Sequence, residues 1–449
     1  MNISRIYDIY RDACDGKVTT DTRTIKGGEL FIALKGENFD GNQFVGKALE
    51  LGALYAIADR SCGDPDPRII KVDDTLATLW ELARWHREHL NVPTLGQNGV
   101  MVGGNRLTVI SLTGTNGKTT TKELIRAVLS THFKVSATEG NLNNNIGVPL
   151  TILKMNEETE LALVEMGASH PGDINELVVV AHPDIGLITN VGKAHLLGFG
   201  SFEGVKATKG ELYDYLLAHG WKKVFVNVDN PHLCEMTSLR PGLEEIPYGV
   251  KYQDVTVLPS DNEHPFLRLV VSGRTINTQL VGAYNADNVL AAIAVGDWFG
   301  IGLEDAASAI EAYTPSNNRS QMVRTERNTL IVDAYNANPS SMDAALDNFA
   351  LVESSRKLAL LGGMRELGAE SAAEHLRIAQ KAVAVEGAEV CFVGEEFAAA
   401  AQALAGDRVR WFDTSASLAA FLHDNPVSGA TVLVKGSRGI KMETVIPEL

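Results

Sequence analysis

A short loop at residues 113–122, rich in glycine, threonine and lysine, has the clearest chemical pattern in this sequence. An apolar, strand-like run from Leu107 to Leu112 precedes the loop, and a helical pattern from Lys118 to Ser130 follows it. Glycines such as Gly114 and Gly117 let backbone N–H groups turn inward around an anion, and the following helix adds the positive end of its dipole. The composition and the flanking elements therefore predict a loop that binds the phosphates of ATP or GTP.

The loop is a compact version of the usual nucleotide-binding pattern. The first glycine of G-x-x-x-x-G-K-[ST] would fall at Leu112, which leaves G-x-x-G-K-T. Lys118 can reach the β- and γ-phosphates, and the Thr119 hydroxyl can bind Mg²⁺. A plain glycine turn between a strand and a helix is the alternative explanation. We predict that ATP contacts Gly114, Thr115, Asn116, Gly117, Lys118, Thr119 and Thr120.

Two side chains outside the loop have the chemistry of metal ligands. Phosphoryl transfer needs cations that neutralise charge on the phosphoryl oxygens. Glu165 ends an apolar strand-like run, where an unpaired carboxylate is costly to bury and a metal ion would compensate it. His195 follows another such run, at residues 185–191. The alternatives are a capping or ion-paired carboxylate at Glu165 and a structural histidine at His195.

The composition is that of a large, acidic globular protein. A chain of 449 residues is too long for one core and predicts about three domains. The net charge of −16, with no block rich in Lys and Arg, argues against nucleic acid or an anionic membrane as a partner. We find no signal-peptide pattern and no apolar run of membrane-spanning length, so we expect a cytoplasmic protein.

The four cysteines are scattered and show no C-x-x-C spacing. Neither a disulfide framework nor a zinc site is therefore expected. We expect most of these side chains to be buried as small apolar groups. They are Cys14, Cys62, Cys234 and Cys391.

The elements that position the candidate residues predict three α/β domains. Residues 1–76 combine short strands and turns in a small domain. A helix from Leu76 to His89 leads into the next domain, residues 77–313, where a glycine-rich loop at residues 95–105 precedes alternating strands and helices. That alternation predicts a doubly wound, mostly parallel sheet. Ligands bind beyond the carboxyl ends of such strands, where Glu165 and His195 lie.

Residues 314–449 show a second alternation that predicts a Rossmann-like domain. This domain has no phosphate loop of its own, so we expect it to close over a nucleotide held by the central domain. The expected strands are residues 329–333, 357–361, 390–393 and 431–434, and the expected helices are residues 340–349 and 372–385.

Several motifs together resemble the Mur ligases, which form amide bonds through an acyl phosphate during peptidoglycan synthesis, and the resemblance covers the whole chain. The string Tyr-Asn-Ala-Asn-Pro-x-Ser-Met at residues 335–342 is the sharpest of them. The matching segments are residues 114–122, 141–149, 164–168, 188–192, 194–195, 285–288, 333–342 and 435–439.

The resemblance implies a ligase of cell wall biogenesis that uses ATP and two Mg²⁺ ions. Its implied substrates are UDP-N-acetylmuramoyl-tripeptide and D-alanyl-D-alanine. The N-terminal domain would bind the UDP-sugar, the central domain ATP, and the C-terminal domain the adenine and the incoming amine. The resemblance also favours a monomer.

The resemblance assigns roles to further residues. Lys118, Thr119 and Glu165 would hold the phosphates and the first Mg²⁺, and His195 would bind the second. Lys209, which on chemistry alone could be a solvated helix residue, matches a lysine that reacts with CO₂ to form an anionic carbamate that attracts Mg²⁺. The catalytic set would be Lys118, Glu165, His195, Lys209 and Arg319, with Arg319 reaching the γ-phosphoryl group. Asn285, Asn288, Asp333 and Asn336 would orient ribose and adenine, and Thr22, Arg23, Lys35, Asn143 and Asn144 would bind the UDP-linked substrate.

Other functions share part of this pattern. A ligase that adds the third peptide residue would show an Asp-Asn-Pro-Arg string, which is absent, and a folylpolyglutamate synthase would lack the N-terminal domain. A GTP-dependent switch would need an Asn-Lys-x-Asp string, and Thr189-Asn190-Val191-Gly192 does not match it. A non-catalytic nucleotide-binding scaffold remains an alternative. The third residue of the tripeptide, diaminopimelate or lysine, is not fixed by the sequence.

Overall fold

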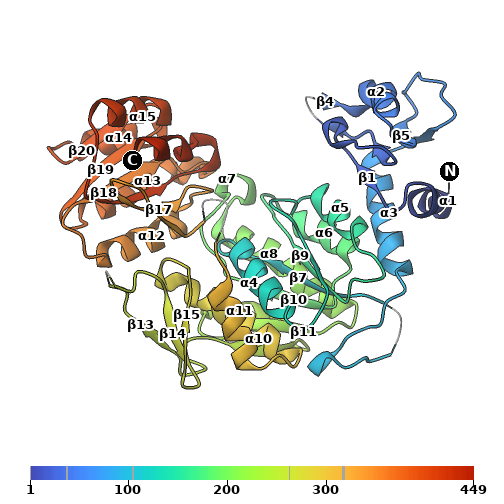
Figure 1. The fold of residues 1–449 in the computed structure, drawn as a ribbon, viewed down its shortest axis with the longest axis horizontal. Coiled ribbons are helices and arrows are strands. Elements are labelled where there is room, and N and C mark those ends of the chain that lie inside the picture. The colour runs from blue at the N-terminus through green and yellow to red at the C-terminus, as the bar shows by residue number, and fades with distance from the viewer. Residues whose placement is uncertain (1, 37–38, 104–105, 262, 316–318) are drawn as a thin grey trace.

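The computed structural model describes residues 2–36, 39–103, 106–261, 263–315 and 319–449. It contains three α/β domains in chain order, with the N-terminal and C-terminal domains at opposite ends and the central domain between them (Figure 1). This is the expected fold class. Among the described residues, no helix is both long and apolar enough to cross a lipid bilayer.

The N-terminal domain is built on a four-stranded parallel sheet of order β1-β2-β5-β6. Its strands are β1 (Val18–Thr19), β2 (Leu30–Ile32), β5 (Tyr55–Asp59) and β6 (Ile69–Val72), and a small hairpin pairs β3 (Lys35–Gly36) with β4 (Phe39–Asp40). Its helices are α1 (Ile3–Asp8), which continues as a π-helical turn (Ile9–Ala13), and α2 (Val45–Glu50).

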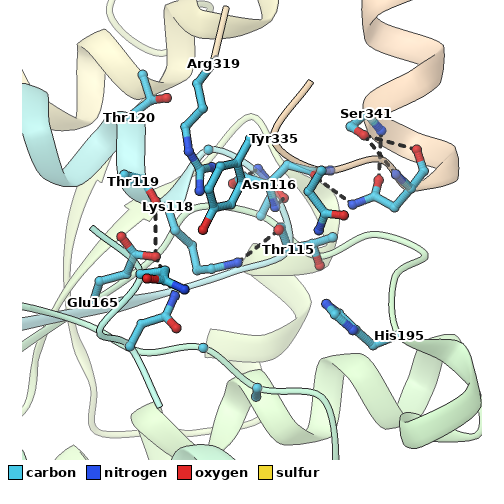
Figure 2. Close-up of a pocket in the computed structure, with 18 of the residues that line it drawn as sticks. Thr115, Asn116, Lys118, Thr119, Thr120, Glu165, His195, Arg319, Tyr335 and Ser341 are labelled. Carbon is cyan, nitrogen blue, oxygen red and sulfur yellow. Dashed lines mark hydrogen bonds between the residues drawn. The ribbon is translucent and has the colours of Figure 1, made fainter. Parts of the chain in front are cut away.

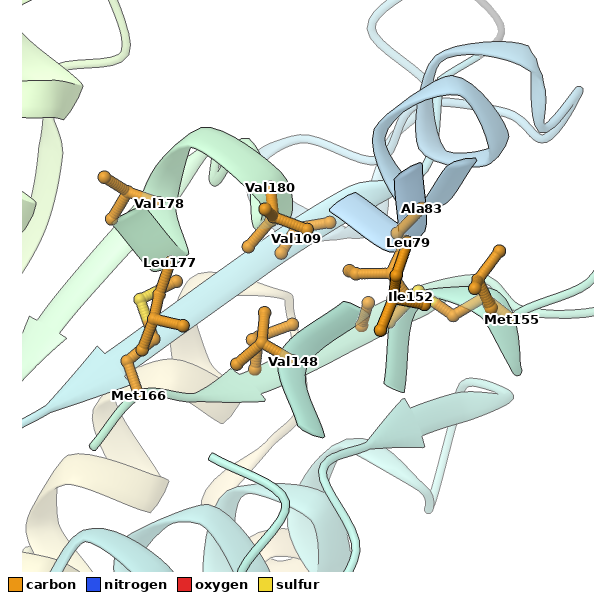
Figure 3. Close-up of a cluster of buried hydrophobic side chains, with 14 of the residues drawn as sticks. Leu79, Ala83, Val109, Val148, Ile152, Met155, Met166, Leu177, Val178 and Val180 are labelled. Carbon is orange, nitrogen blue, oxygen red and sulfur yellow. The ribbon is translucent and has the colours of Figure 1, made fainter. Parts of the chain in front are cut away.

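Helix α3 (Thr75–His89) connects this domain to the central one. Asp74 caps its first turn, because the carboxylate accepts a hydrogen bond from Ala77 N. Leu79 and Ala83 on this helix pack against Ile152 and Met155, as Figure 3 shows. Helix α3 shares one apolar core with the N-terminal and the central domain. The predicted boundary between residues 76 and 77 stays a prediction.

The central domain has a six-stranded, fully parallel sheet of order β12-β11-β10-β7-β9-β8. The strands are β7 (Thr108–Thr113), β8 (Val135–Ala137), β9 (Leu161–Glu165), β10 (Ile185–Ile188), β11 (Lys223–Asn227) and β12 (Glu244–Tyr248). The helices are α4 (Lys118–Leu129), α5 (Gly147–Leu153), α6 (Asp173–Ala181), α7 (Leu196–Phe199), α8 (Phe202–Ala218), α9 (Pro231–Ser238), α10 (Ala286–Trp298) and α11 (Leu303–Ala312).

Both faces of the central sheet are buried. Successive side chains of a strand point to opposite faces, so Val109 contributes to one apolar core and Ile110 to the other. Strand β7 lies between β9 and β10, where the chain passes from one half of the sheet to the other. Loops after strands at such a switch point form the usual ligand site, and the phosphate loop is the loop that follows β7.

A three-stranded antiparallel sheet in the central domain was not expected from the sequence. It consists of β13 (Thr256–Leu258), β14 (Arg268–Val271) and β15 (Arg274–Asn277). Ser272 and Gly273 join the last two strands, and both have positive φ, as two-residue hairpin turns require. This Ser-Gly pair between two short strand-like runs is the signal that could have revealed the hairpin.

The C-terminal domain has a six-stranded sheet of order β16-β17-β21-β18-β19-β20, in which only the edge strand β16 is antiparallel. The strands are β16 (Gln321–Arg324), β17 (Thr329–Asp333), β18 (Lys357–Gly362), β19 (Ala388–Val393), β20 (Val409–Phe412) and β21 (Thr431–Lys435). The helices are α12 (Pro339–Leu351), α13 (Ser371–Val383), α14 (Ala398–Ala403) and α15 (Ser415–Asp424). The four expected strands and two expected helices are confirmed within a few residues, whereas β16, β20, α14 and α15 were not predicted.

The four cysteines are free, and three of them are buried as expected, whereas Cys234 is half-buried. The predicted loop at residues 95–105 is confirmed up to residue 103 as a turn that pairs Leu95 with Met101. Gly104 and Asn105 of that loop lie outside the described residues.

Candidate functional site

A cleft of about 700 Å³ is lined by both the central and the C-terminal domain. Figure 2 shows its inner surface, with the phosphate loop at the centre. The predicted site residues that line it are Thr115, Asn116, Gly117, Lys118, Thr119, Thr120, Asn143, Asn144, Glu165, His195, Asn285, Asn288, Arg319, Asp333 and Asn336. Gly114, Lys209, Thr22, Arg23 and Lys35 are not among the lining residues.

The two glycines of the phosphate loop are required by its geometry. Gly114 has φ 143° and Gly117 has φ 77°, a region that favours glycine. A Cβ atom at Gly117 would also lie 2.6 Å from Oδ1 of Asn288. Helix α4 starts directly after Gly117, and no side chain caps its first turn. Its amides are therefore free to bind phosphate oxygens.

The Lys118 side chain folds back over the loop. Its Nζ donates hydrogen bonds to the carbonyl oxygens of Gly114, at 2.8 Å, and of Thr115, at 3.1 Å. Burial lowers the pKa of Lys118, and the nearby positive charge of Arg319 acts in the same direction. The charge of Glu165 acts in the opposite direction, but among the described residues no carboxylate lies within ion-pair distance of this ammonium group. A bound phosphate would supply an anionic partner in direct contact.

Glu165 lies at the carboxyl end of β9, with 1% of the residue exposed. Its Oε1 accepts hydrogen bonds from Thr119 Oγ1, at 3.2 Å, and from Asn143 Nδ2, at 2.8 Å. Its Oε2 is buried and has no hydrogen-bond partner among the described residues. Glu165 also interacts electrostatically with Lys118, so the ion-paired alternative stays open. The orphaned oxygen is the kind of ligand that Mg²⁺ prefers.

Lys209 lies on α8 with only 2% exposed, so the solvated-helix alternative is wrong. Burial lowers the pKa of Lys209 well below its ordinary value, and the positive charge of Lys118 lowers it further. Within the described residues, no carboxylate lies within ion-pair distance of its Nζ, which is 5.4 Å from the centre of the Phe199 ring. A buried lysine of this kind favours the neutral amine, the form that reacts with CO₂.

His195 immediately precedes α7 and has φ 51°, an uncommon conformation outside glycine. Its Nδ1 contacts Oε2 of Glu366, a residue of the C-terminal domain. Burial lowers the pKa of His195; the Glu366 carboxylate opposes this effect, Lys118 and Lys209 add to it, and the net shift of the pKa is downward. This net shift favours the neutral imidazole, which is the form that binds metals.

The candidate metal ligands fit Mg²⁺ but do not complete its coordination. No group of three or more His, Cys, Asp or Glu side chains arranged to hold a metal occurs in the part of the chain that the structure describes. Glu165 offers a free carboxylate oxygen beside the hydroxyl of Thr119. The remaining ligands would have to come from phosphate oxygens, water and a modified Lys209, because Mg²⁺ requires near-octahedral oxygen coordination.

Arg319 enters the cleft from the connection between the central and C-terminal domains. Its guanidinium lies 3.6 Å from the centre of the Tyr335 ring, a stacked cation–π arrangement visible in Figure 2. The guanidinium of Arg438 lies 5.7 Å from the same ring. Tyr335 was not singled out as a contact residue from the sequence. The Tyr-Asn-Ala-Asn string that contains it was the available signal.

Asp333 and Asn336 contact a buried lysine, Lys435, which the sequence analysis gave only as part of the motif at residues 435–439. Lys435 is 1% exposed, and its Nζ lies 2.5 Å from Oδ2 of Asp333 and 3.2 Å from the carbonyl oxygen of Asn336. Asp333 and Lys435 are register partners at the carboxyl ends of two adjacent strands, β17 and β21. Parallel strand ends at one sheet edge were the signal that could have paired them.

Asn285 and Asn288 support the phosphate loop from behind. Thr121 Oγ1 donates a hydrogen bond to Asn288 Oδ1, and Asn288 Nδ2 donates one to Asn285 Oδ1. Asn285 Nδ2 in turn donates to the carbonyl oxygen of Val281. These bonds hold the start of α10 against α4, while both asparagines also line the cleft, so their contact with ribose or adenine stays a prediction.

Asn116 links the phosphate loop to the C-terminal domain. Its Nδ2 donates to Ser340 Oγ at 2.9 Å, and its Oδ1 accepts from Asn338 Nδ2 at 2.8 Å. Its backbone N–H donates to Oδ1 of Asn190, which follows β10. Asn338 and Ser340 were seen only as parts of a motif, because a contact between segments more than 200 residues apart has no local sequence signal.

The predicted substrate residues fall into two groups. Thr22, Arg23 and Lys35 belong to the N-terminal domain, where Arg23 pairs with Asp21 at 2.6 Å. Asn143 and Asn144 lie in the cleft, and Asn144 Oδ1 accepts a hydrogen bond from Gly147 N at the start of α5. Their contacts with substrate stay predictions.

Comparison with known protein families covers the three domains in turn. A model described as the Mur ligase family catalytic domain matches residues 17–84. A model of the Mur ligase middle domain matches residues 112–296, and one described as the Mur ligase glutamate ligase domain matches residues 318–438. The chain belongs to the Mur ligase family.

Individual Mur ligases match over almost their full lengths. The UDP-N-acetylmuramoyl-tripeptide–D-alanyl-D-alanine ligase of Bacillus subtilis is 35% identical, over 96% of this chain and 92% of that protein. The protein of the same name from Escherichia coli is 33% identical, over 100% of this chain and 98% of that protein. A crystal structure of MurF from Acinetobacter baumannii has a TM-score of 0.82 at 29% identity and covers 96% of this chain and 93% of its own. The Mur ligase fold is therefore shared along the chain.

Proposed function

We propose that this Mur ligase joins D-alanyl-D-alanine to UDP-N-acetylmuramoyl-tripeptide at the expense of ATP. The observation that carries the proposal is the cleft, which places Lys118 and the orphaned carboxylate oxygen of Glu165 opposite Arg319 and the Tyr335 segment of the C-terminal domain. Relatives that carry this name align over nearly the whole chain, which supports the choice of substrates.

ATP would bind with its phosphates on the loop and its adenosine towards the C-terminal domain. The free amides of α4 and the Lys118 ammonium would hold the β- and γ-phosphates. Asn285, Asn288, Asp333 and Asn336 line the cleft and would contact ribose and adenine. Two Mg²⁺ ions would be held by Thr119 with Glu165 and by His195 with carbamylated Lys209, and when bound they would neutralise charge on the phosphoryl oxygens.

The first chemical step brings two anions together. The terminal carboxylate of the tripeptide would attack the γ-phosphorus, the bond to the bridging oxygen would break, and ADP and an acyl phosphate would form. Lys118 and Arg319 would offset the charge that accumulates on the transferred group. Arg319 is held in the cleft by its stacking on Tyr335, which suits this role.

The second step forms the amide. The neutral amine of D-alanyl-D-alanine would attack the acyl carbonyl carbon, and inorganic phosphate would leave with the bonding electron pair. Acyl phosphates hydrolyse in water, so the site must exclude it during this step. The C-terminal domain, which already contacts the phosphate loop through Asn338 and Ser340, is the element that would close the cleft.

The remaining assignments complete the proposal. Thr22, Arg23 and Lys35 would contact the UDP moiety, and Asn143 and Asn144 the peptide near the reacting carboxylate. We place the reaction in the cytoplasm, where ATP and nucleotide-linked precursors are available, and we expect a monomer.

Phosphate release from Mg-ATP tests the proposal directly. The protein is incubated with UDP-N-acetylmuramoyl-tripeptide, with and without D-alanyl-D-alanine, and the products are weighed by mass spectrometry. Strong stimulation by the dipeptide, with an amide product of the combined mass less water, supports the assignment. Stimulation by single amino acids or folates instead would overturn it in favour of a sister activity. Tripeptides with diaminopimelate or lysine at the third position then define specificity.

A further inference from the structure

One short turn of the central domain packs against the C-terminal domain and is hydrogen-bonded there by Glu366. The turn comprises residues 195–197, at the start of α7. Glu366 contacts it twice, because its backbone oxygen accepts a hydrogen bond from Leu197 N at 3.0 Å and its Oε2 contacts His195 Nδ1. Because Glu366 contacts the turn through both its backbone and its side chain, it restricts the position and the rotation of the His195 ring.

Both partners of this contact have strained backbone conformations. His195 has φ 51° and Glu366 has φ 63°, and both lie in the left-handed region. Such conformations cost free energy outside glycine and persist where the surrounding structure requires them, often at functional sites. That two of them meet across a domain interface indicates that the His195–Glu366 geometry is specifically maintained.

The contact leaves the other ring nitrogen of His195 free. A carboxylate that accepts from Nδ1–H fixes the tautomer and leaves the lone pair on Nε2. No hydrogen bond to Nε2 is present among the residues that the structure describes, and His195 lines the cleft. Figure 2 shows the ring directed towards the side of the cleft that holds Lys118 and Glu165.

We propose that Glu366 is a positioning residue that orients His195, so that Nε2 faces the cleft as a metal ligand only when the C-terminal domain is docked. The proposal rests on the role of His195 in the proposed function. A carboxylate bound to the second nitrogen of a metal-binding histidine raises its affinity for the metal and fixes its direction. Docking of the C-terminal domain and assembly of the metal site thereby become one event.

A neighbouring ion pair provides the matched control. Lys193 Nζ lies 2.8 Å from Glu370 and 2.8 Å from Glu374, and these contacts join the same two segments without touching His195. Removing Lys193 weakens docking alone. Removing the Glu366 carboxylate also releases the imidazole.

The test measures Mn²⁺ binding rather than turnover. The full chain, with a non-hydrolysable ATP analogue and bicarbonate, is titrated with Mn²⁺ and free Mn²⁺ is read by electron paramagnetic resonance. In Glu366→Ala and Glu366→Gly we expect the weaker of two Mn²⁺ sites to lose about tenfold or more in affinity, with the tighter site unchanged. Glu366→Gly removes the side chain without the positive-φ penalty, so the two variants must agree. Glu366→Gln, whose amide oxygen can still accept from Nδ1–H, should retain most of the affinity.

Three outcomes would overturn the proposal. If both Glu366 truncations keep the Mn²⁺ affinity while His195→Ala loses the weaker site, the positioning role of Glu366 is refuted and the metal role of His195 is retained. Because docking is part of the proposal, Lys193→Ala should lose some Mn²⁺ affinity but less than the Glu366 truncations, and a loss as large as theirs would show that docking alone, not ring orientation, sets the affinity. No effect of His195→Ala would overturn both this inference and the metal role of His195. The Mn²⁺ titration measures binding and does not depend on ligase activity. A failure of the proposed function can therefore be distinguished from a failure of this inference.

Discussion

Asn338 donates a hydrogen bond from Nδ2 to Oδ1 of Asn116 at 2.8 Å, and this bond joins the C-terminal domain directly to the phosphate loop. The same Asn338 caps α12, because its Oδ1 accepts a hydrogen bond from Ser341 N. One side chain therefore begins a helix in one domain and contacts the nucleotide loop of another. The position of the loop and the position of the C-terminal domain are linked through it.

Replacement of Asn338 separates these two roles. Serine retains a capping oxygen but cannot reach Asn116, whereas alanine loses both contacts. We expect Asn338→Ser to raise KM for ATP severalfold and to leave the free energy of unfolding nearly unchanged. We expect Asn338→Ala to raise KM as well and to lower the free energy of unfolding by about 1 kcal/mol. Steady-state kinetics and denaturant unfolding of both variants measure the effects. Equal KM values for Asn338→Ser and the parent would contradict the linkage.

Two lysines in the same helix should behave oppositely. Among the described residues, the Lys118 ammonium group donates its hydrogen bonds to loop carbonyl oxygens, so Lys118→Ala should lower turnover by about a hundredfold or more with little change in stability. Lys122 is fully buried and contacts the Thr138 carbonyl oxygen and Glu123, so Lys122→Met should cost about 1–3 kcal/mol of stability. ATP turnover and thermal unfolding of both variants provide the comparison. Preserved turnover in Lys118→Ala would refute the phosphate role.

The carbamate proposed at Lys209 predicts chemical rescue. Lys209→Ala should lose most activity, because the buried amine is the only part of the side chain that can become an anion. Acetate or another short carboxylate should restore part of that activity by occupying the vacated space. Activity is measured across acetate concentrations, with chloride at equal ionic strength as the control. Full activity of Lys209→Ala without any additive would exclude the carbamate.

His182 should make the protein less stable in acid. Burial and the charges of Arg106 and Arg87 lower its folded-state pKa to about 4. Because this value lies below the ordinary pKa of about 6.5, the unfolded state binds more protons between the two values. The contribution of His182 to stability is therefore complete above pH 6.5 and is lost as pH falls towards 4.

The replacement His182→Asn tests this titration, since asparagine tolerates the positive φ of 47° at this position. Between pH 7 and pH 4.5 the free energy of unfolding of the parent should fall more steeply than that of the variant, by on the order of 1 kcal/mol after allowance for solvent screening. Denaturant unfolding across this range measures the difference. Parallel pH curves would refute the prediction.

The sequence predicted best what local patterns encode. The phosphate loop, Glu165 at a strand end and the alternating strands of two parallel sheets follow from short-range periodicity and glycine placement. The hairpin at β14 and β15 was missed because a short Ser-Gly turn was overlooked within a long α/β pattern. Burial of Lys209 also escaped the sequence, because a lysine within a helix gives no indication of which face is covered.

The sequence did not predict the contacts between domains. Asn116 with Asn338 and Glu366 with His195 join residues that are 171 or more positions apart. Each depends on how separate sheets are placed, which no local pattern specifies. Family resemblance supplied most of the individual roles proposed for these residues.

Arg319 lies on the connection that enters β16, and it stacks on Tyr335, in the loop that follows β17 of the C-terminal sheet. Its position relative to bound ATP therefore follows the orientation of that sheet. A small molecule that held the C-terminal sheet in another orientation would withdraw this cation while leaving the nucleotide in place. Inhibitors of this protein consequently need not resemble ATP or either substrate.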